Sequence, residues 1–221
     1  MVIRIVPSLL FSGFNSIKSE KHSLLRYIGS IEQSIRINAR REPDELLLID
    51  VSGNLDTDLL SRLTALLFCP VCYGGGIRSI ANVQAVLRFG ADRVIISSRR
   101  PELIREAARE LGSQAITASV DDGSVDTAKL VVDHGVGEIL LSSPARDGLL
   151  CGYDLDLIRE VSAAVAVPVV ARGGCSGYPD MLVAVEAGAS AVSAGALFQF
   201  TAATPKGAAL YLADNGVRVR L

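Results

Sequence analysis

The sequence is poor in the residues that proteins use to bind nucleic acids and metals. It has no tryptophan, only 5% aromatic residues and a formal net charge of −2 over 221 residues. A nucleic-acid binder needs a basic face and stacking rings, so this composition disfavours that class. The two histidines, His22 and His134, have no metal-ligand spacing, so we expect no metal and no other cofactor.

The chain also lacks a convincing membrane segment. Its longest uncharged run, from Ala187 to Pro205, is rich in small residues and contains Gln199, which makes it a poor membrane span. The N-terminus shows neither the basic segment nor the small-residue cleavage site of a signal peptide. We therefore expect a soluble, cytoplasmic protein.

Four cysteines offer little evidence of redox or zinc chemistry. Cys69 and Cys72 form a C-x-x-C motif, while Cys151 and Cys175 stand alone. A redox or zinc function would require a helix N-terminus or a second pair of ligands near the motif. The motif lies instead on an apolar run that is typical of a strand, so we interpret its cysteines as ordinary structural residues.

What the sequence does contain is a regular alternation of strand-like and helix-like runs, with 49% hydrophobic residues available for a core. The predicted strands are 4–10, 45–51, 71–73, 93–96, 115–120, 138–142, 168–171 and 191–194. The predicted helices are 31–41, 57–67, 79–89, 101–111, 126–135, 154–164, 179–187 and 205–215. Eight of each predict a single (β/α)₈ barrel domain over residues 1–221; a doubly wound open sheet, which usually has fewer strands, is the competing fold.

An internal repeat appears when the sequence is compared with itself at an offset of 98 residues. The segment 70–76, PVCYGGG, aligns with 168–174, PVVARGG, and 90–98 aligns with 188–196. Any barrel repeats its hydrophobic strands, but the coincidence of glycine pairs and small residues at the same strand ends is more specific. The pattern predicts that the barrel arose by duplication of a half barrel.

The repeated glycines and small residues fall where this fold places phosphate. Backbone N–H groups can approach anionic oxygens closely at glycine, and the start of a following helix adds a positive dipole. We call such a group of glycines and small residues at strand ends a phosphate cradle. One cradle is predicted after strands seven and eight, and the repeat predicts a second across the barrel mouth. Two cradles would suit a ligand with two phosphates. The alternative is that these glycines only shape tight turns.

Acidic residues at strand ends are candidates for proton transfer. Asp50, Asp121 and Asp147 each lie where a predicted strand ends and the following loop begins. We expect all three side chains to point into the barrel mouth. Each of them could instead cap the following helix.

Several motifs together resemble a known family. They are residues 72–78, 90–93, 112–114, 137–141, 146–148 and 152–154, with sequences CYGGGIR, GADR, GSQ, GEILL, RDG and GYD. In these the chain is similar to the cyclase subunit of imidazole glycerol phosphate synthase. The resemblance implies a barrel that receives ammonia from a glutaminase subunit and cyclises a two-phosphate ribonucleotide in histidine synthesis.

The family's catalytic residues are only partly present. By the resemblance, Asp121 matches one of two catalytic aspartates, Lys18 a loop lysine and Asp147 a strand-end acid, while the second aspartate is replaced by Leu10. A substrate-contacting serine is replaced by Arg172, and the segment between Asp121 and Val136 is shorter than in the family. The implied phosphate positions are Gly76, Ser97 and Ser98 on one side and Gly148, Gly174, Gly195 and Ala196 on the other; the glycine pair after strand seven adds Gly173.

A charged ring that gates ammonia entry in the family maps onto four residues at strand starts: Arg4, Glu45, Arg93 and Glu138. These residues could equally form a neutral salt-bridge cluster that closes the barrel floor. Asp92 and Gln114 match positions at or near the family's glutaminase-binding face.

Three functions remain open from the sequence. The first is an ammonia-dependent synthase subunit, and the second is a catalytically silent barrel that activates a glutaminase and conducts ammonia to a third protein. Leu10 and two further stretches, 25–29 and 199–205, resemble the branch of the family associated with surface polysaccharides, where the acceptor is a sugar amidotransferase. The third is the sibling isomerase of histidine synthesis, which also needs the carboxylate that Leu10 replaces.

Overall fold

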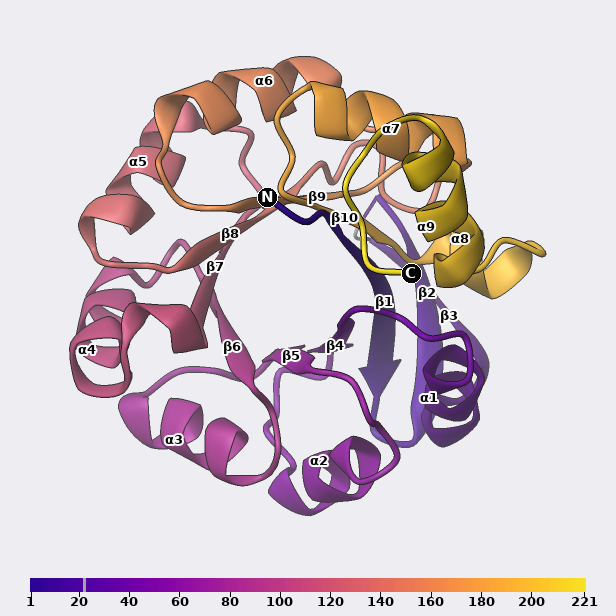
Figure 1. The fold of residues 1–221 in the computed structure, drawn as a ribbon. Coiled ribbons are helices and arrows are strands. Elements are labelled where there is room, and N and C mark those ends of the chain that lie inside the picture. The colour runs from indigo at the N-terminus through magenta and orange to yellow at the C-terminus, as the bar shows by residue number, and fades with distance from the viewer. Residues whose placement is uncertain (22) are drawn as a thin grey trace.

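The computed structural model describes residues 1–21 and 23–221 and confirms the barrel; His22 lies outside the described residues. Eight parallel strands surround a central axis, and pairing of the first with the last closes the cylinder (Figure 1). These strands are β1 (Arg4–Ser12), β4 (Leu46–Asp50), β5 (Val71–Gly74), β6 (Arg93–Ser97), β7 (Ile116–Val120), β8 (Glu138–Ser142), β9 (Val169–Arg172) and β10 (Ala191–Ala194).

Helices form the outer layer, as Figure 1 shows. The main ones are α1 (Ile31–Ala39), α2 (Thr57–Thr64), α3 (Ile80–Arg88), α4 (Pro101–Leu111), α5 (Val125–Asp133), α6 (Leu155–Ala164), α7 (Tyr178–Glu186) and α9 (Pro205–Asp214). The side chains of Asp56, Ser79 and Asp154 each accept a hydrogen bond from the backbone N–H three residues later, which fixes where α2, α3 and α6 begin. Among the described residues, no helix is long and apolar enough to span a membrane.

The core has two layers because side chains alternate along each strand. The inner layer fills the barrel with residues such as Val6, Leu47, Cys72 and Leu140. The outer layer packs the other face of the strands against the helices. Burial raises the pKa of the Cys72 thiol, and also that of Cys69 on the preceding loop, so neither thiol is activated in the described structure.

A β-hairpin was not predicted from the sequence. Strands β2 (Asn15–Glu20) and β3 (Leu24–Ser30) extend the sheet from the carboxyl end of β1, where Leu10 pairs with Ile17. Ser19 Oγ donates to the Asp147 carboxylate, and the N–H of Lys21 donates to the Asp147 carbonyl at 3.0 Å. The hairpin therefore reaches the loop that follows β8. Two short elements were also missed, the 3₁₀ helix η1 (Ser113–Ala115) and α8 (Ala196–Phe200).

The repeat of 98 residues is also present in three dimensions. Gly75 and Gly76 after β5 have φ of +113° and +69°, and their counterparts Gly173 and Gly174 after β9 have +101° and +93°. Elsewhere, a Cβ at Gly90 would lie 2.7 Å from Thr64 Oγ1. A Cβ at Gly188 would lie 2.8 Å from the Cβ of Ser162, the residue 98 positions after Thr64. The same close packing thus recurs in both halves, which supports the predicted duplication.

Candidate active site at the barrel mouth

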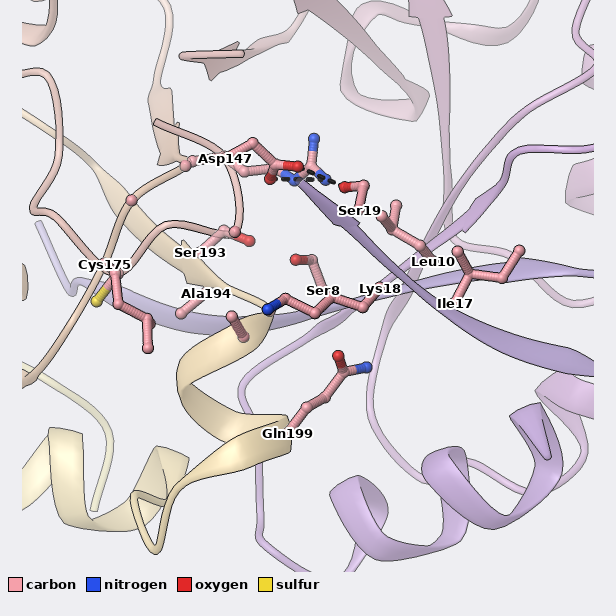
Figure 2. Close-up of a pocket in the computed structure, with 17 residues that line it drawn as sticks. Ser8, Leu10, Ile17, Lys18, Ser19, Asp147, Cys175, Ser193, Ala194 and Gln199 are labelled. Atoms are coloured by element: carbon pink, nitrogen blue, oxygen red, sulfur yellow. Dashed lines mark hydrogen bonds and ion pairs between the residues drawn. The ribbon is translucent and has the colours of Figure 1, made fainter. Parts of the chain in front are cut away.

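The first of two cavities at the carboxyl ends of the strands gathers one predicted phosphate cradle (Figure 2). The hairpin and the loops after β8, β9 and β10 line this cavity. All five residues predicted for this cradle line it: Gly148, Gly173, Gly174, Gly195 and Ala196. Sequence positions almost 50 residues apart therefore meet at one site.

Two of these glycines are also required by the backbone. Gly174 has φ of +93°, and a Cβ there would lie 2.1 Å from the Gly152 carbonyl oxygen. Gly148 has φ of +74°, and a Cβ there would lie 2.2 Å from the Ser19 carbonyl oxygen. Both positions exclude any larger residue. Turn formation thus accounts for these two glycines by itself, and their contact with phosphate stays a prediction.

Polar side chains complete the first cavity. The Lys18 amino group lies 3.2 Å from Glu20 Oε1 and 5.1 Å from the centre of the Phe200 ring. In the view of Figure 2 the lysine extends across the cavity, past Ser8, with its amino group on the side of Ala194. Gln199, which sequence reasoning did not select, also lines the cavity, and its buried Nε2 has no hydrogen-bond partner in the described part of the chain. Its one signal was an isolated amide in a segment of small, apolar residues.

The second cavity lies beside the first and contains Asp121. Ser119 Oγ donates to Asp121 Oδ2 at 2.7 Å, which orients the carboxylate. Leu10 lines both cavities, and Ser97 lines the second. Gly76 and Ser98 of the other predicted cradle follow directly after the lining residues Gly75 and Ser97 and do not themselves line the cavity. The structure thus brings only part of this cradle to the mouth.

Asp50 does not join the other two acids at the mouth, contrary to expectation. Leu47 and Ile49 belong to the inner layer of the barrel, so the alternation along β4 turns Asp50 outward. Its Oδ1 accepts a hydrogen bond from the N–H of Ser52 at 2.8 Å. Burial raises the pKa of this carboxyl, against the lowering effect of the Ser52 hydrogen bonds. Asp50 lines neither mouth cavity, and a catalytic role for it has no geometric support.

Asp147 lines the first cavity, and Arg172 lies at the boundary between the two cavities. Asp147 is buried and accepts the hydrogen bond from Ser19. Arg172, at the end of β9, is only 8% exposed, and its Nη2 lies 3.8 Å from Asp147 Oδ1. Arg172 lines both cavities. A buried cation therefore lies where the first and second cavities meet.

The opposite end of the barrel holds the predicted charged ring. Arg4 Nη1 lies 2.7 Å from Glu45 Oε2, and Arg4 also contacts Glu138. Arg93 contacts the same two carboxylates, so the four charges alternate in a closed ring. Burial raises the pKa of Glu45, although the positive charges of Arg93 and Arg4 act to lower it. For Arg93, burial acts to lower the pKa, but the negative charges of Glu138 and Glu45 outweigh burial and raise it. The geometry suits both a gate and a plain closure of the floor.

The two residues predicted for a partner interface are exposed at this amino end. Asp92 precedes β6 and Gln114 lies in η1, directly before β7. Asp92 Oδ2 also accepts a hydrogen bond from the N–H of Val71 at 2.8 Å, so this residue has a structural role of its own. Contact with a partner stays a prediction.

The fold and the site define a (β/α)₈ barrel with glycine-lined cavities at its mouth and a ring of ion pairs at its floor. A family model described as histidine biosynthesis protein matches residues 4–204. The chain belongs to this family.

A curated relative confirms the resemblance seen in the sequence motifs. The chain is 35% identical over 254 aligned residues to the imidazole glycerol phosphate synthase subunit HisF of Thermobifida fusca (strain YX). The alignment covers 100% of this chain and 99% of that protein. The alignment is longer than the 221 residues of this chain, so the relative contains segments that this chain lacks.

Proposed function

We propose that the chain is a cyclase-type subunit of a complex similar to imidazole glycerol phosphate synthase. It binds a ligand with two phosphates at the barrel mouth and receives ammonia from a glutaminase at the barrel floor. The observation that carries the proposal is the first cavity, where five predicted phosphate-binding residues meet Lys18 in a barrel of the histidine biosynthesis family. A lysine beside small residues and exposed backbone is suited to an anion.

The ammonia route is proposed along the barrel axis. The four-charge ring closes the floor, and the inner layer above it contains mostly apolar side chains, with Cys72 and Thr117 at its lower edge. Thr117 Oγ1 lies 3.5 Å from Glu138 Oε2, so a polar group stands directly above the ring. Ammonia is small and neutral, and movement of one arginine would admit it. Arg4 is the better candidate because its side chain is 29% exposed, against 17% for Arg93.

The finer assignment depends on Leu10. A leucine cannot transfer a proton, so Asp121 lacks the carboxylate partner that the family uses. We propose that the chain forms little or no imidazole product and passes ammonia to a separate acceptor, a sugar amidotransferase of surface-polysaccharide synthesis. The sibling isomerase activity is the weaker candidate because it requires the same missing carboxylate.

The experiment combines the purified chain with a glutaminase from the same genome. We expect a stable complex and faster glutamine hydrolysis than with the glutaminase alone, which is the matched control. Failure of every such glutaminase to bind at about micromolar concentration would contradict both the synthase and the ammonia-channel functions.

Phosphate binding needs a separate test with a suitable variant. Gly174→Asp would place a Cβ against the Gly152 carbonyl and disturb the turn, so its effect would not report on charge. Ala196 already carries a Cβ and lines the cavity. We expect Ala196→Asp to abolish saturable binding of a two-phosphate ribonucleotide, measured by calorimetry, while the uncharged Ala196→Asn retains most of it. Equal binding by both variants would contradict the phosphate cradle.

A further inference from the structure

Three neighbouring strands present buried polar side chains side by side at the mouth. In the sheet register, Arg172 on β9 pairs with Ser142 on β8 and with Ser193 on β10. Residues paired in this way point to the same face of a sheet. Leu140, Val170 and Ala191, two positions earlier on the same strands, belong to the inner layer, so all three polar side chains point into the barrel.

Each of these side chains has an unsatisfied polar atom. Arg172 Nε, Ser142 Oγ and Ser193 Oγ are buried and have no hydrogen-bond partner among residues 1–21 and 23–221. A buried donor without a partner costs about 1–3 kcal/mol, and more when it is charged. Arg172 and Ser193 also line the first cavity, whereas Ser142 lines neither mouth cavity. Two unsatisfied polar groups that border the same cavity indicate a ligand site rather than a chance defect in packing.

Asp147 compensates the charge of Arg172 only in part. Its Oδ1 lies 3.8 Å from Arg172 Nη2, and its carboxylate also accepts a hydrogen bond from Ser19 of the hairpin. Arg172 could therefore act merely as a latch that holds Asp147 and, through Ser19, the hairpin. That function would use Nη2 and leaves the buried Nε and the two serine hydroxyls unexplained.

We propose that Arg172, with Ser193 beside it in the first cavity, binds a carboxylate group of the ligand, next to the phosphate held at Gly174 and Ala196. The planar guanidinium matches a carboxylate with two parallel hydrogen bonds, and the Ser193 hydroxyl can donate to the same oxygens. The proposal rests on the proposed phosphate cradle and adds a third anion subsite between the two phosphate positions.

The test compares two probes that differ in the carboxylate. These are 3-phosphoglycerate, which carries a phosphate and a carboxylate, and glycerol 3-phosphate, which lacks the carboxylate. We expect the wild-type protein to bind 3-phosphoglycerate about tenfold more tightly by calorimetry. Arg172→Gln should remove this preference and leave the affinity for glycerol 3-phosphate unchanged. Arg99→Gln is the matched control, because Arg99 is exposed on the loop after β6, at the same end of the barrel, and its loss should preserve the preference.

The outcomes separate this proposal from the phosphate cradle. Equal affinity of the wild-type protein for both esters, or equal loss of both in Arg172→Gln, would overturn the carboxylate subsite and leave Arg172 as a latch. If neither ester binds, the proposed phosphate cradle is refuted, and the carboxylate subsite is then tested with malonate, which carries carboxylates and no phosphate. Malonate binding that Arg172→Gln abolishes supports the subsite, and absence of malonate binding overturns it.

Discussion

Leu10 and Asp121 line the same cavity from opposite sides of the barrel mouth. Leu10 comes from β1, and Asp121 directly follows β7, which lies four strands away around the cylinder. Ser119 holds the Asp121 carboxylate in place, so one half of an acid–base pair is positioned while the other half is an alkyl group. This arrangement predicts binding without efficient proton transfer.

Leu10→Asp should restore part of the missing chemistry if the mouth still recognises the family's ligand. A positioned carboxylate contributes roughly 10²–10⁴-fold to a proton-transfer step. We expect little or no release of aminoimidazole carboxamide ribotide from the two-phosphate ribonucleotide by the wild-type protein, and a measurable rate in Leu10→Asp. The assay uses saturating ammonium salt, which bypasses the glutaminase and the ring.

Leu10→Asn is the control, because it has nearly the same shape as aspartate and cannot accept a proton at neutral pH. Wild-type turnover in the ordinary enzymatic range of about 1–10³ s⁻¹ would refute the loss of cyclase activity. Inactivity of both variants would indicate that Arg172 and the short segment after Asp121 have remodelled the mouth for another ligand.

The charged ring should be important for stability. Arg93 contacts both Glu45 and Glu138, so Arg93→Met leaves two buried carboxylates with Arg4 alone. Removing one partner of a buried ion pair typically costs about 3–5 kcal/mol. We expect a loss of this size in urea unfolding for Arg93→Met and a smaller loss for Arg4→Met, because Arg4 is more exposed. Arg62→Met, which breaks an exposed pair with Glu32, should change stability little; an equal loss in all three variants would contradict a special role of the ring.

Phe68 should contribute to partner binding at the barrel floor. It is fully exposed on the loop between α2 and β5, at the same end of the barrel as Asp92 and Gln114. Large aromatic residues at the centre of an interface often contribute about 2 kcal/mol or more, which corresponds to roughly 30-fold in affinity. We expect Phe68→Ser to weaken glutaminase binding by about this factor in a titration. Phe14→Ser, at the mouth, should have no effect; the reverse pattern would place the partner at the other end.

The sequence predicted the eight barrel strands because each is a short apolar run bounded by clear turn residues. The hairpin was missed because β2, NSIKSE, is mostly polar and has weak strand propensity; it forms by extending the edge of β1. The position of Asp50 was wrong because its place at a strand end was considered without the alternation of Leu47 and Ile49 along β4.

The parts of the candidate site that depend on backbone conformation could be predicted from the sequence. The parts that depend on how side chains are buried could be predicted less well. Glycines after β9 mark a turn that only glycine can form, so Gly174 was visible as a pattern. From the sequence, Arg172 could be noticed only because it replaces a serine that the family has at this position. Its burial beside Ser142 and Ser193 depends on the register of three strands that are distant in sequence, and no local pattern encodes that register.

The pH dependence of stability should report on burial in the ring. Burial raises the pKa of Glu45 above its ordinary value of 4.5, despite the opposing charges of Arg93 and Arg4. The folded state then holds this proton more tightly than the unfolded state does. The stabilising contribution is present below the ordinary pKa and is lost as the pH rises through the folded pKa. The free energy of unfolding of the wild-type protein, relative to Glu45→Gln, should therefore fall as the pH rises above the ordinary pKa of 4.5.

Glu42 provides a control of opposite sign. It is exposed, and the hydrogen bond and charge of Lys206 lower its pKa below 4.5. Its contribution is present above the ordinary pKa and is lost as the pH falls through the folded pKa, so the wild-type protein should gain stability relative to Glu42→Gln as the pH rises. Urea unfolding of the three proteins over the same pH series measures both slopes. A rising difference for Glu45→Gln as well would mean that the arginines outweigh burial, and the ring would then be a net stabilising cluster when fully charged.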